Sequence, residues 1–336
     1  MKKWIYIIFG IIFSMFILIS INNFQWGIAV AAALFFPLFL LVFLHQIDVF
    51  EREKFKNILT VFFLSFIFSF AYSLIWVPLY HQFLEGFEDG FIYNLLRAGI
   101  PEEIVKILPV IIILKRTKYI NEPIDYLIYA SSSALGFAFL ENIDYIYDYK
   151  ESSPNIIAIR SLLPTFMHIA CSSVFALGIF FYQETRKIKY VFSFYFIAAF
   201  THALYNAYLT YIIIFFIIIY YARLMRALLN ISPFFEEEKI KTIKKGQYLL
   251  GFAFIFLHLI NVIFIIYNSN IFKIKITNQV WFQDFIFIVM AFIFYKIISK
   301  NLKINRVEFK IFGKKNIRIF SNIQQTIIDN YYAKFK

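Results

Sequence analysis

Apolar runs of about twenty residues recur along this chain, and short polar segments separate them. A helix rises about 1.5 Å per residue, so a run of this length crosses the hydrocarbon core of a bilayer. Only 16% of the residues are charged and 61% are hydrophobic, whereas a soluble domain carries about 25% charged residues. We therefore predict an all-α polytopic membrane protein, a bundle of about eight to nine transmembrane helices. The candidate runs are residues 4–21, 28–46, 58–79, 99–114, 125–147, 158–182, 190–215, 247–267 and 281–298.

Basic residues lie in short clusters between the apolar runs. The formal net charge is +12, but this distribution is typical of cytoplasmic loops that face anionic lipid, not of a nucleic-acid-binding groove. The loops at 51–56, 115–118 and 186–189 are basic, whereas 81–93 contains no lysine or arginine. The positive-inside rule therefore puts the three basic loops and the N-terminus in the cytoplasm. We expect a multi-pass protein in contact with lipid and without a nucleic-acid partner.

The second half of the chain conflicts with a simple alternation of spans. Continued alternation would place residues 222–245 outside, although they are basic. Either the stretch 190–221 crosses the bilayer and partly returns, or an earlier segment such as 99–114 is re-entrant.

We divide the chain into a transmembrane domain, 1–298, and a basic cytoplasmic tail, 299–336. The part of the domain that carries the candidate site is about 95–215. In the tail, apolar and polar residues alternate around Gly313, which predicts a short β-hairpin over 307–320.

Two adjacent carboxylates open one of the apolar helices. Glu102 and Glu103 stand at its start, and Lys106 lies one turn below both. Charged groups at membrane depth are costly and are therefore functional candidates. Acids at a helix N-terminus can also serve only the helix dipole. A lysine inside an apolar helix requires a partner, which favours a functional cluster.

A third carboxylate ends the next apolar run. Glu141 and Asn142 follow a stretch rich in small residues, 131–138. Small residues let neighbouring helices approach closely, so we predict that this helix is central in the bundle. The alternative is that Glu141 marks the exit from the membrane, since Asp144 and Asp148 follow it.

A polar stripe runs along the following helix. Arg160, Pro164, His168 and Ser172 are spaced by four and share one face. A lone histidine on an apolar helix is usually a core residue, but this face also carries an arginine and a serine.

The single cysteine, Cys171, excludes an intramolecular disulfide and a multi-cysteine zinc site.

The second candidate histidine has an amide companion. His202 and Asn206 are one turn apart, so the amide can orient the ring or donate to an oxyanion. The alternative is an interhelical hydrogen bond with a structural role.

Consecutive spans run in opposite directions. Glu102, Glu141 and His168 therefore converge on the extracytoplasmic half of the bilayer, and His202 can reach the same depth.

The motifs resemble the PrsW-type intramembrane protease family, which shares a superfamily with type II CAAX prenyl endopeptidases and bacteriocin-processing membrane proteases. The resemblance covers about residues 30–215. It rests on Glu102-Glu103-Ile-Val-Lys106, Phe137-Ala-Phe-Leu-Glu141-Asn142, His168 and His202-Ala-Leu-Tyr-Asn206, with Asp48-Val-Phe-Glu51 and the approach from Asp125 to Gly136. It implies a protease of the bacterial inner membrane that cuts a membrane-anchored protein near the outer leaflet, as in the first cleavage of an anti-sigma factor.

The resemblance also implies roles for the candidate residues. Glu102 or Glu103 would be the general base, and His168 would help to activate water. Glu141 would act as a metal ligand or an acid. His202 and Asn206 would stabilise the oxyanion, or His202 would bind metal. Lys106, Asn142 and Arg160 would support the site.

The metal and the reaction class stay open at this point. His168, His202 and Glu141 could supply the three ligands of a catalytic zinc site. A metal-free glutamate mechanism would use the same side chains. Within the proteases, a CAAX-type or peptide-processing enzyme differs only in substrate. Outside them, a proton-coupled transporter or a non-catalytic binding protein would also place glutamate and histidine in the membrane. The oligomeric state is not predicted.

Overall fold

The structure is a computed structural model that describes residues 24–87, 89–148, 155–208, 211–272 and 278–302, together with single positions at 10 and between 326 and 334. Every regular element in these ranges is helical, as the composition predicts. The α-helices are α2 (Phe24–Ile47), α3 (Phe55–Phe83), α4 (Phe91–Asn94), α5 (Ile100–Arg116), α6 (Pro123–Asp148), α7 (Asn155–Thr185), α8 (Lys189–Tyr208), α9 (Tyr211–Asn230), α10 (Ile243–Phe272) and α11 (Asn278–Asn301). The predicted span 4–21 and the predicted hairpin 307–320 lie outside the described residues.

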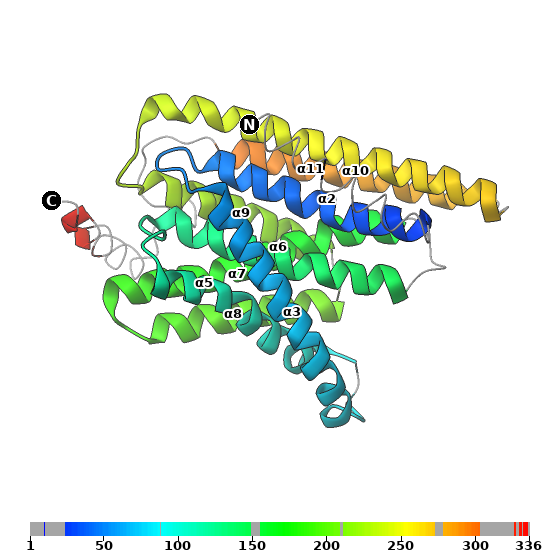
Figure 1. The fold of residues 1–336 in the computed structure, drawn as a ribbon, viewed down its shortest axis with the longest axis horizontal. Helices are drawn as coiled ribbons and strands as arrows, with labels where there is room; N and C mark the ends of the chain where they lie inside the picture. The colour runs from blue at the N-terminus through cyan, green and yellow to red at the C-terminus, as the bar shows by residue number, and fades with distance from the viewer. Residues whose placement is uncertain are drawn as a thin grey trace.

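Helices α6 and α7 form the centre of the bundle. α2, α10 and α11 lie side by side along one side of them, and α5 and α8 lie on the other, while α3 runs obliquely across α6 (Figure 1). A Cβ added to Gly136 of α6 would lie only 2.1 Å from the carbonyl oxygen of Phe62 in α3. The small-residue run therefore does allow the close approach of helices that the sequence predicts.

Three of the described helical stretches are both long and apolar enough to cross a membrane: Phe55–Tyr80, Leu162–Thr185 and Ile213–Asn230. The first has large apolar side chains pointing outward, among them Leu74 and Ile75. An outward apolar surface of this kind suits contact with lipid rather than with water.

The predicted single span 190–215 is wrong. In the structure α8 ends at Tyr208 and a separate helix, α9, begins at Tyr211. The physical reason is that 190–215 contains neither glycine nor proline, so no strong helix breaker marks where one helix ends. The polar residues between Tyr205 and Tyr211, Asn206 and Thr210 among them, are the weaker signal that lies at the boundary.

A π-helical segment, Leu95–Gly99, leads directly into α5. The carbonyl oxygen of Arg97 accepts hydrogen bonds from Tyr72 Oη at 3.2 Å and from Trp76 Nε1 at 3.1 Å, both from α3. A Cβ on Gly99 would lie 2.5 Å from the carbonyl oxygen of Ala199 in α8. Both features fix the start of α5, so the position of its first turn is held by two neighbouring helices.

Candidate active site

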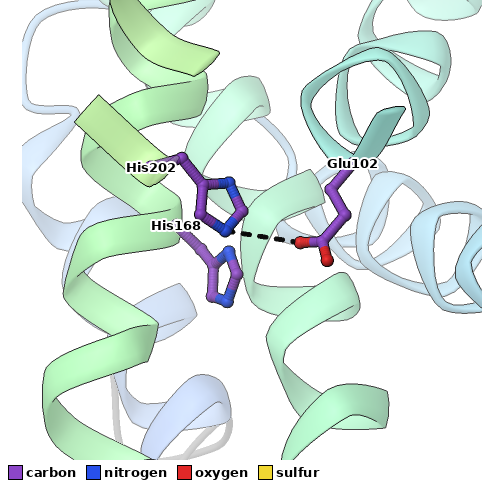
Figure 2. A group of neighbouring side chains, drawn as sticks. All are labelled: Glu102, His168 and His202. Atoms are coloured by element: carbon purple, nitrogen blue, oxygen red, sulfur yellow. Dashed lines mark ion pairs between the residues drawn. The ribbon is translucent and has the colours of Figure 1, made fainter. Parts of the chain in front are cut away.

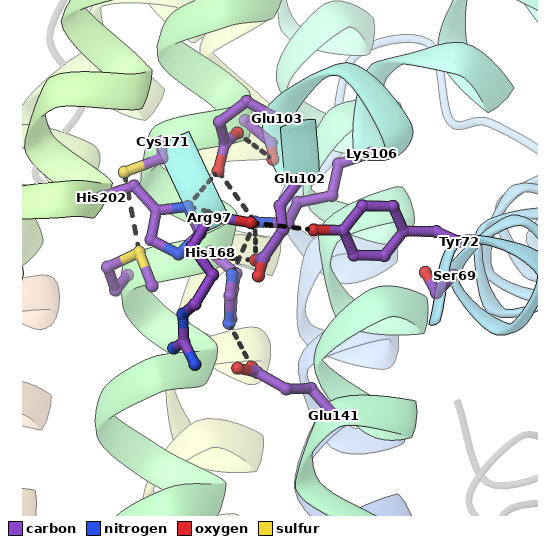
Figure 3. A network of polar contacts seen from close by, with 12 residues as sticks. Ser69, Tyr72, Arg97, Glu102, Glu103, Lys106, Glu141, His168, Cys171 and His202 are labelled. Carbon is purple, nitrogen blue, oxygen red and sulfur yellow. Dashed lines mark hydrogen bonds and ion pairs between the residues drawn. The ribbon is translucent and has the colours of Figure 1, made fainter. Parts of the chain in front are cut away.

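Side chains from four helices meet in one buried polar cluster (Figure 3). The helices are α5, α6, α7 and α8. The cluster consists of Glu102, Glu103 and Lys106 from α5, Glu141 from α6, His168 and Ser172 from α7, and His202 from α8. The structure thus brings together carboxylates and histidines that lie as far apart as residues 102 and 202 in the chain.

Lys106 lies at the centre of this cluster and is fully buried. Its ammonium nitrogen is 2.8 Å from Glu103 Oε1 and 2.7 Å from His168 Nδ1, and it is 3.5 Å from Glu102 Oε2. The same nitrogen lies 4.4 Å from the centroid of the Phe137 ring. The lysine therefore has the acidic partner that its burial in an apolar helix requires.

Glu103 is fully buried and held by three donors. Lys106 Nζ lies at 2.8 Å and His202 Nδ1 at 2.9 Å from Oε1, and Ser172 Oγ donates to Oε2 at 3.0 Å. A carboxylate with this many partners is stabilised as an anion and fixed in position. It can orient other side chains but has little free capacity for a substrate.

The two histidines share one pattern of contacts. His168 Nε2 lies 2.7 Å from Glu141 Oε2, and His202 Nδ1 lies 2.9 Å from Glu103 Oε1. A carboxylate accepts hydrogen bonds, so each of these ring nitrogens carries a proton when the ring is neutral. The opposite nitrogen of each ring, His168 Nδ1 and His202 Nε2, then carries the lone pair. His168 Nδ1 accepts from Lys106 Nζ at 2.7 Å, whereas His202 Nε2 has no hydrogen-bond partner in the described part of the chain.

Glu102 completes a group of three possible metal ligands with these rings (Figure 2). One ligand atom each from Glu102, His168 and His202 lie within 4.8 Å of one another. Glu102 Oε2 and His202 Nε2, 3.5 Å apart, are buried and have no hydrogen-bond partner in the described part of the chain. Two imidazole nitrogens and a carboxylate are donors that zinc accepts, so these residues fit a catalytic metal.

This set differs from the one predicted from the sequence, which had Glu141 in place of Glu102. Glu141 instead contacts His168 from the outside and forms an ion pair with Arg160, whose Nη2 lies 3.3 Å away. The guanidinium of Arg160 also lies over the ring of Tyr145, 3.6 Å from its centroid. Glu141 is therefore a partner of a histidine, held in place by a cation.

Two other residues predicted for the site, Asn206 and Asn142, are not part of the cluster. Asn206 lines a cavity of about 750 Å³ together with Arg97 and Arg160. Asn142 is fully buried in α6, and neither polar atom of its side chain has a hydrogen-bond partner among the described residues. The predicted pairing of Asn206 with His202 at one site stays a prediction.

A second cavity, of about 520 Å³, gives access to the cluster. Glu102 and Glu141 both line it, together with Ser69 and Tyr72 of α3 and Tyr145 of α6. The side chains of Glu102 and Glu141 are 12% and 22% exposed, whereas those of Glu103 and Lys106 are fully buried. Adjacent glutamates on one helix thus have different surroundings, one at the cavity and one in the protein interior.

Sequence reasoning did not assign Tyr72, Arg97 or Tyr145 to the surroundings of the site. Tyr72 and Trp76 are one turn apart on α3, and Arg97 is a basic residue on the acidic, extracytoplasmic side of the predicted topology. An isolated arginine in that position was the one signal that could have pointed to these residues.

Buried carboxylates and histidines that border a cavity inside a bundle of apolar helices define a class of membrane protein, one equipped to activate water within the bilayer. Comparison with protein families gives the particular family. The family described as PrsW family intramembrane metalloprotease matches residues 53–232, more than half of the chain and the part that carries every residue of the cluster. The chain belongs to this family. It is accordingly an integral membrane protein and a hydrolase of the protease class. Comparisons with curated proteins and with solved structures found no match.

Proposed function

We propose that this chain is an intramembrane endopeptidase that hydrolyses a peptide bond of a membrane-anchored protein, with Glu102, His168 and His202 as the ligands of a catalytic zinc ion. The orientation of the two histidines carries the proposal. Each ring uses one nitrogen to contact a carboxylate and turns the other toward the interior of the cluster. That nitrogen has no partner among the described residues in His202, and in His168 it lies 2.7 Å from Lys106 Nζ, which a bound zinc ion would displace. Carboxylate–histidine pairs of this kind fix the tautomer and the ring orientation at metal sites.

A bound zinc ion supplies a water of lowered pKa, about 7, and polarises the substrate carbonyl. The chain's own residues do the rest. Glu141 and Glu103 hold the two imidazole rings in place. Glu141 also borders the cavity beside Glu102, so its carboxylate can take a proton from a water molecule there. Lys106 offsets the negative charge of the paired glutamates.

One contact favours a second candidate, a metal-free mechanism. Lys106 Nζ lies 2.7 Å from His168 Nδ1, the nitrogen that a metal would use. In that mechanism the Lys106 ammonium supplies the positive charge of the site in place of a metal ion. Glu102, which lines the cavity, then takes the proton from the attacking water.

We also propose a topology in which α8 and α9 each cross the bilayer. The additional crossing removes the conflict in the charge pattern, because the basic segment 222–245 and the tail then face the cytoplasm with the other basic loops. Under this topology the first turn of α5 and the last turns of α6 lie in the extracytoplasmic half. The cluster is therefore at the depth where a single-span substrate enters from the outer leaflet.

The substrate proposed from the resemblance is a protein of the anti-sigma-factor kind, cut near its membrane anchor. A CAAX-type or peptide-processing activity would use the same cluster on a different segment. The test compares newly formed peptide termini in the membrane proteomes of cells that express the wild type or Glu102→Gln. Termini near the outer ends of single-span proteins, present only with the wild type, support the proposal. Identical sets of termini in both cells contradict it.

Metal analysis separates the two mechanisms. We expect one zinc per chain in the purified wild-type protein and its loss in His168→Ala and His202→Ala. Asn206→Ala is the matched control, because Asn206 is on the same helix as His202 but lines the other cavity. Full proteolytic activity in metal-free protein would instead establish the glutamate mechanism.

A further inference from the structure

A second cluster of carboxylates lies at the opposite end of α6 from Glu141. Asp48 follows α2, Glu122 precedes α6, and Asp125 is in the first turn of α6. All three are fully buried, and one oxygen from each lies within 4.8 Å of the others. At about 1.5 Å per residue, the 16 residues from Asp125 to Glu141 separate this cluster from the candidate active site by about 24 Å.

Each carboxylate has one oxygen with a protein partner. Asp48 Oδ2 accepts from the backbone N–H of Glu53 at 2.5 Å. Asp125 Oδ2 accepts from the backbone N–H of Glu122 at 2.9 Å, and Glu122 Oε2 accepts from the hydroxyl of Ser232. Two of these bonds are local, and the third joins Glu122 to Ser232, which is 110 residues away in the sequence.

The other oxygen of each carboxylate has no partner. Asp48 Oδ1, Glu122 Oε1 and Asp125 Oδ1 are buried and make no hydrogen bond within the described residues. In the same part of the chain, no basic side chain forms an ion pair with any of them. The N-terminus of α6 stabilises roughly half a unit of negative charge. The guanidinium of Arg52, whose Nε donates to the backbone carbonyl of Asp48 at 3.0 Å, offsets part of the rest without forming an ion pair with the cluster.

Burial without a counter-ion is unfavourable for an ionised carboxylate. It raises the pKa of the Asp48 carboxyl well above its usual range and that of Glu122 to about 7. Either protons or a cation must therefore neutralise the cluster near neutral pH. The three buried oxygens without a donor favour the cation, because one ion can use all three as ligands at once.

We propose that Asp48, Glu122 and Asp125 bind a hard divalent cation, Mg²⁺ or Ca²⁺, through the oxygens that lack a partner. Three carboxylates without histidine or cysteine suit a hard cation. Two oxygens on one Ca²⁺ can be up to about 5.2 Å apart, so oxygens within 4.8 Å of one another fit Ca²⁺ as they stand. Two oxygens on one Mg²⁺ can be up to about 4.2 Å apart, so Mg²⁺ requires the group to be tighter than the 4.8 Å limit.

The bound cation ties together parts of the fold that no helix connects directly. Asp48 brings the segment between α2 and α3, Glu122 and Asp125 bring the start of α6, and Ser232 brings the segment after α9. The site is a structural clamp on the end of α6 remote from the chemistry. It does not depend on the proposed proteolysis, so the two proposals fail independently.

The test is a cation titration of the full chain in detergent after treatment with a chelator. We expect Ca²⁺ or Mg²⁺ at about 100 times its dissociation constant to raise Tm by about 5–10 °C. The rise should disappear in Asp48→Asn and Asp125→Asn. Glu237→Gln, which changes an exposed acid of the 3₁₀ segment after α9, should keep it. The whole series is repeated with His202→Ala so that a cation at the candidate active site does not contribute.

Direct binding needs no variant that must fold. Equilibrium binding of radioactive Ca²⁺ to the wild type should reach one ion per chain, with competition by unlabelled Mg²⁺ showing which ion is preferred. A stoichiometry far below one for both ions, with no rise in Tm, would overturn the proposal and assign the cluster to shared protons.

Discussion

Glu102 and Glu103 are adjacent, yet the same substitution should have different effects at the two positions: a loss of stability at Glu103, and a loss of bound zinc and proteolysis at Glu102. Glu103→Gln removes the charge from a fully buried carboxylate that Lys106, His202 and Ser172 hold at 2.8, 2.9 and 3.0 Å. Loss of one partner from a buried ion pair costs roughly 3–5 kcal/mol. With a fall in Tm of about 2–4 °C per kcal/mol for a domain of this size, Glu103→Gln should lower Tm by about 6–20 °C.

Glu102→Gln should leave stability almost unchanged. Its two ion pairs, to Lys106 and His202, are both 3.5 Å long, and its Oε2 makes no hydrogen bond. At 3.5 Å these contacts are at the long limit of a hydrogen bond, and the substitution also removes the cost of burying a charge. With zinc removed from all proteins, Glu102→Gln should therefore change Tm much less than Glu103→Gln does. In untreated protein it should abolish zinc binding and proteolysis.

The assay is thermal unfolding of the two purified variants and the wild type in one detergent after zinc has been removed with a chelator, in parallel with metal analysis of the untreated proteins. Each variant serves as the control for the other, because they have the same chemistry at neighbouring positions. Equal losses of Tm, or a larger loss for Glu102→Gln, would refute the assignment of Glu103 to positioning and Glu102 to the site's chemistry.

Three further outcomes follow from the structure. Lys106→Met should lower the free energy of unfolding by roughly 3–5 kcal/mol in a denaturation experiment, because it leaves Glu103 buried beside no cation; unchanged stability would contradict its central role. Gly136→Ala should lower Tm far more than Gly246→Ala, because the added Cβ would meet the Phe62 carbonyl oxygen at 2.1 Å, whereas at Gly246 the first contact is a side-chain atom at 3.3 Å; similar shifts in both would argue against the close contact of α3 and α6. Relative to Glu122→Gln, the cation-free wild type should lose stability as pH rises from about 5 to 7, since the folded-state pKa of Glu122 is about 7, above its usual 4.5, so this carboxyl binds more protons in the folded than in the unfolded protein over this range. The difference should approach roughly 3 kcal/mol and be smaller with Ca²⁺ or Mg²⁺ present; parallel pH profiles of the two proteins would contradict the burial of an ionised Glu122.

The sequence predicted the class of fold because apolar run length is a local property. It also predicted which side chains would meet, because the order of spans brings Glu102, Glu141 and His168 to one depth. It could not predict which carboxylate joins the histidines. That choice depends on the rotation of α5 and α6 about their axes, which only tertiary packing sets.

Two other features were beyond sequence reasoning for related reasons. The boundary between α8 and α9 has no glycine or proline to mark it, only a short polar stretch around Asn206 and Thr210. The cluster of Asp48, Glu122 and Asp125 joins residues on separate loops, and loop positions carry no periodic signal. Asp48 and Asp125 stood out only through the family resemblance, which gave them no role.

The π-helical segment Leu95–Gly99 sets the phase of α5 relative to the turn before it. A π turn holds one residue more than an α turn, and each residue of a helix advances the side chains by about 100°. Deleting one residue from this segment would restore a regular helix and leave the apolar content intact. It would also turn Glu102 and Glu103 about a quarter of a circle away from the histidines. The direction in which Glu102 and Glu103 face thus depends on one extra residue in the π-helical segment. Hydropathy does not reveal this residue, and a relative that lacks it would orient the two glutamates differently.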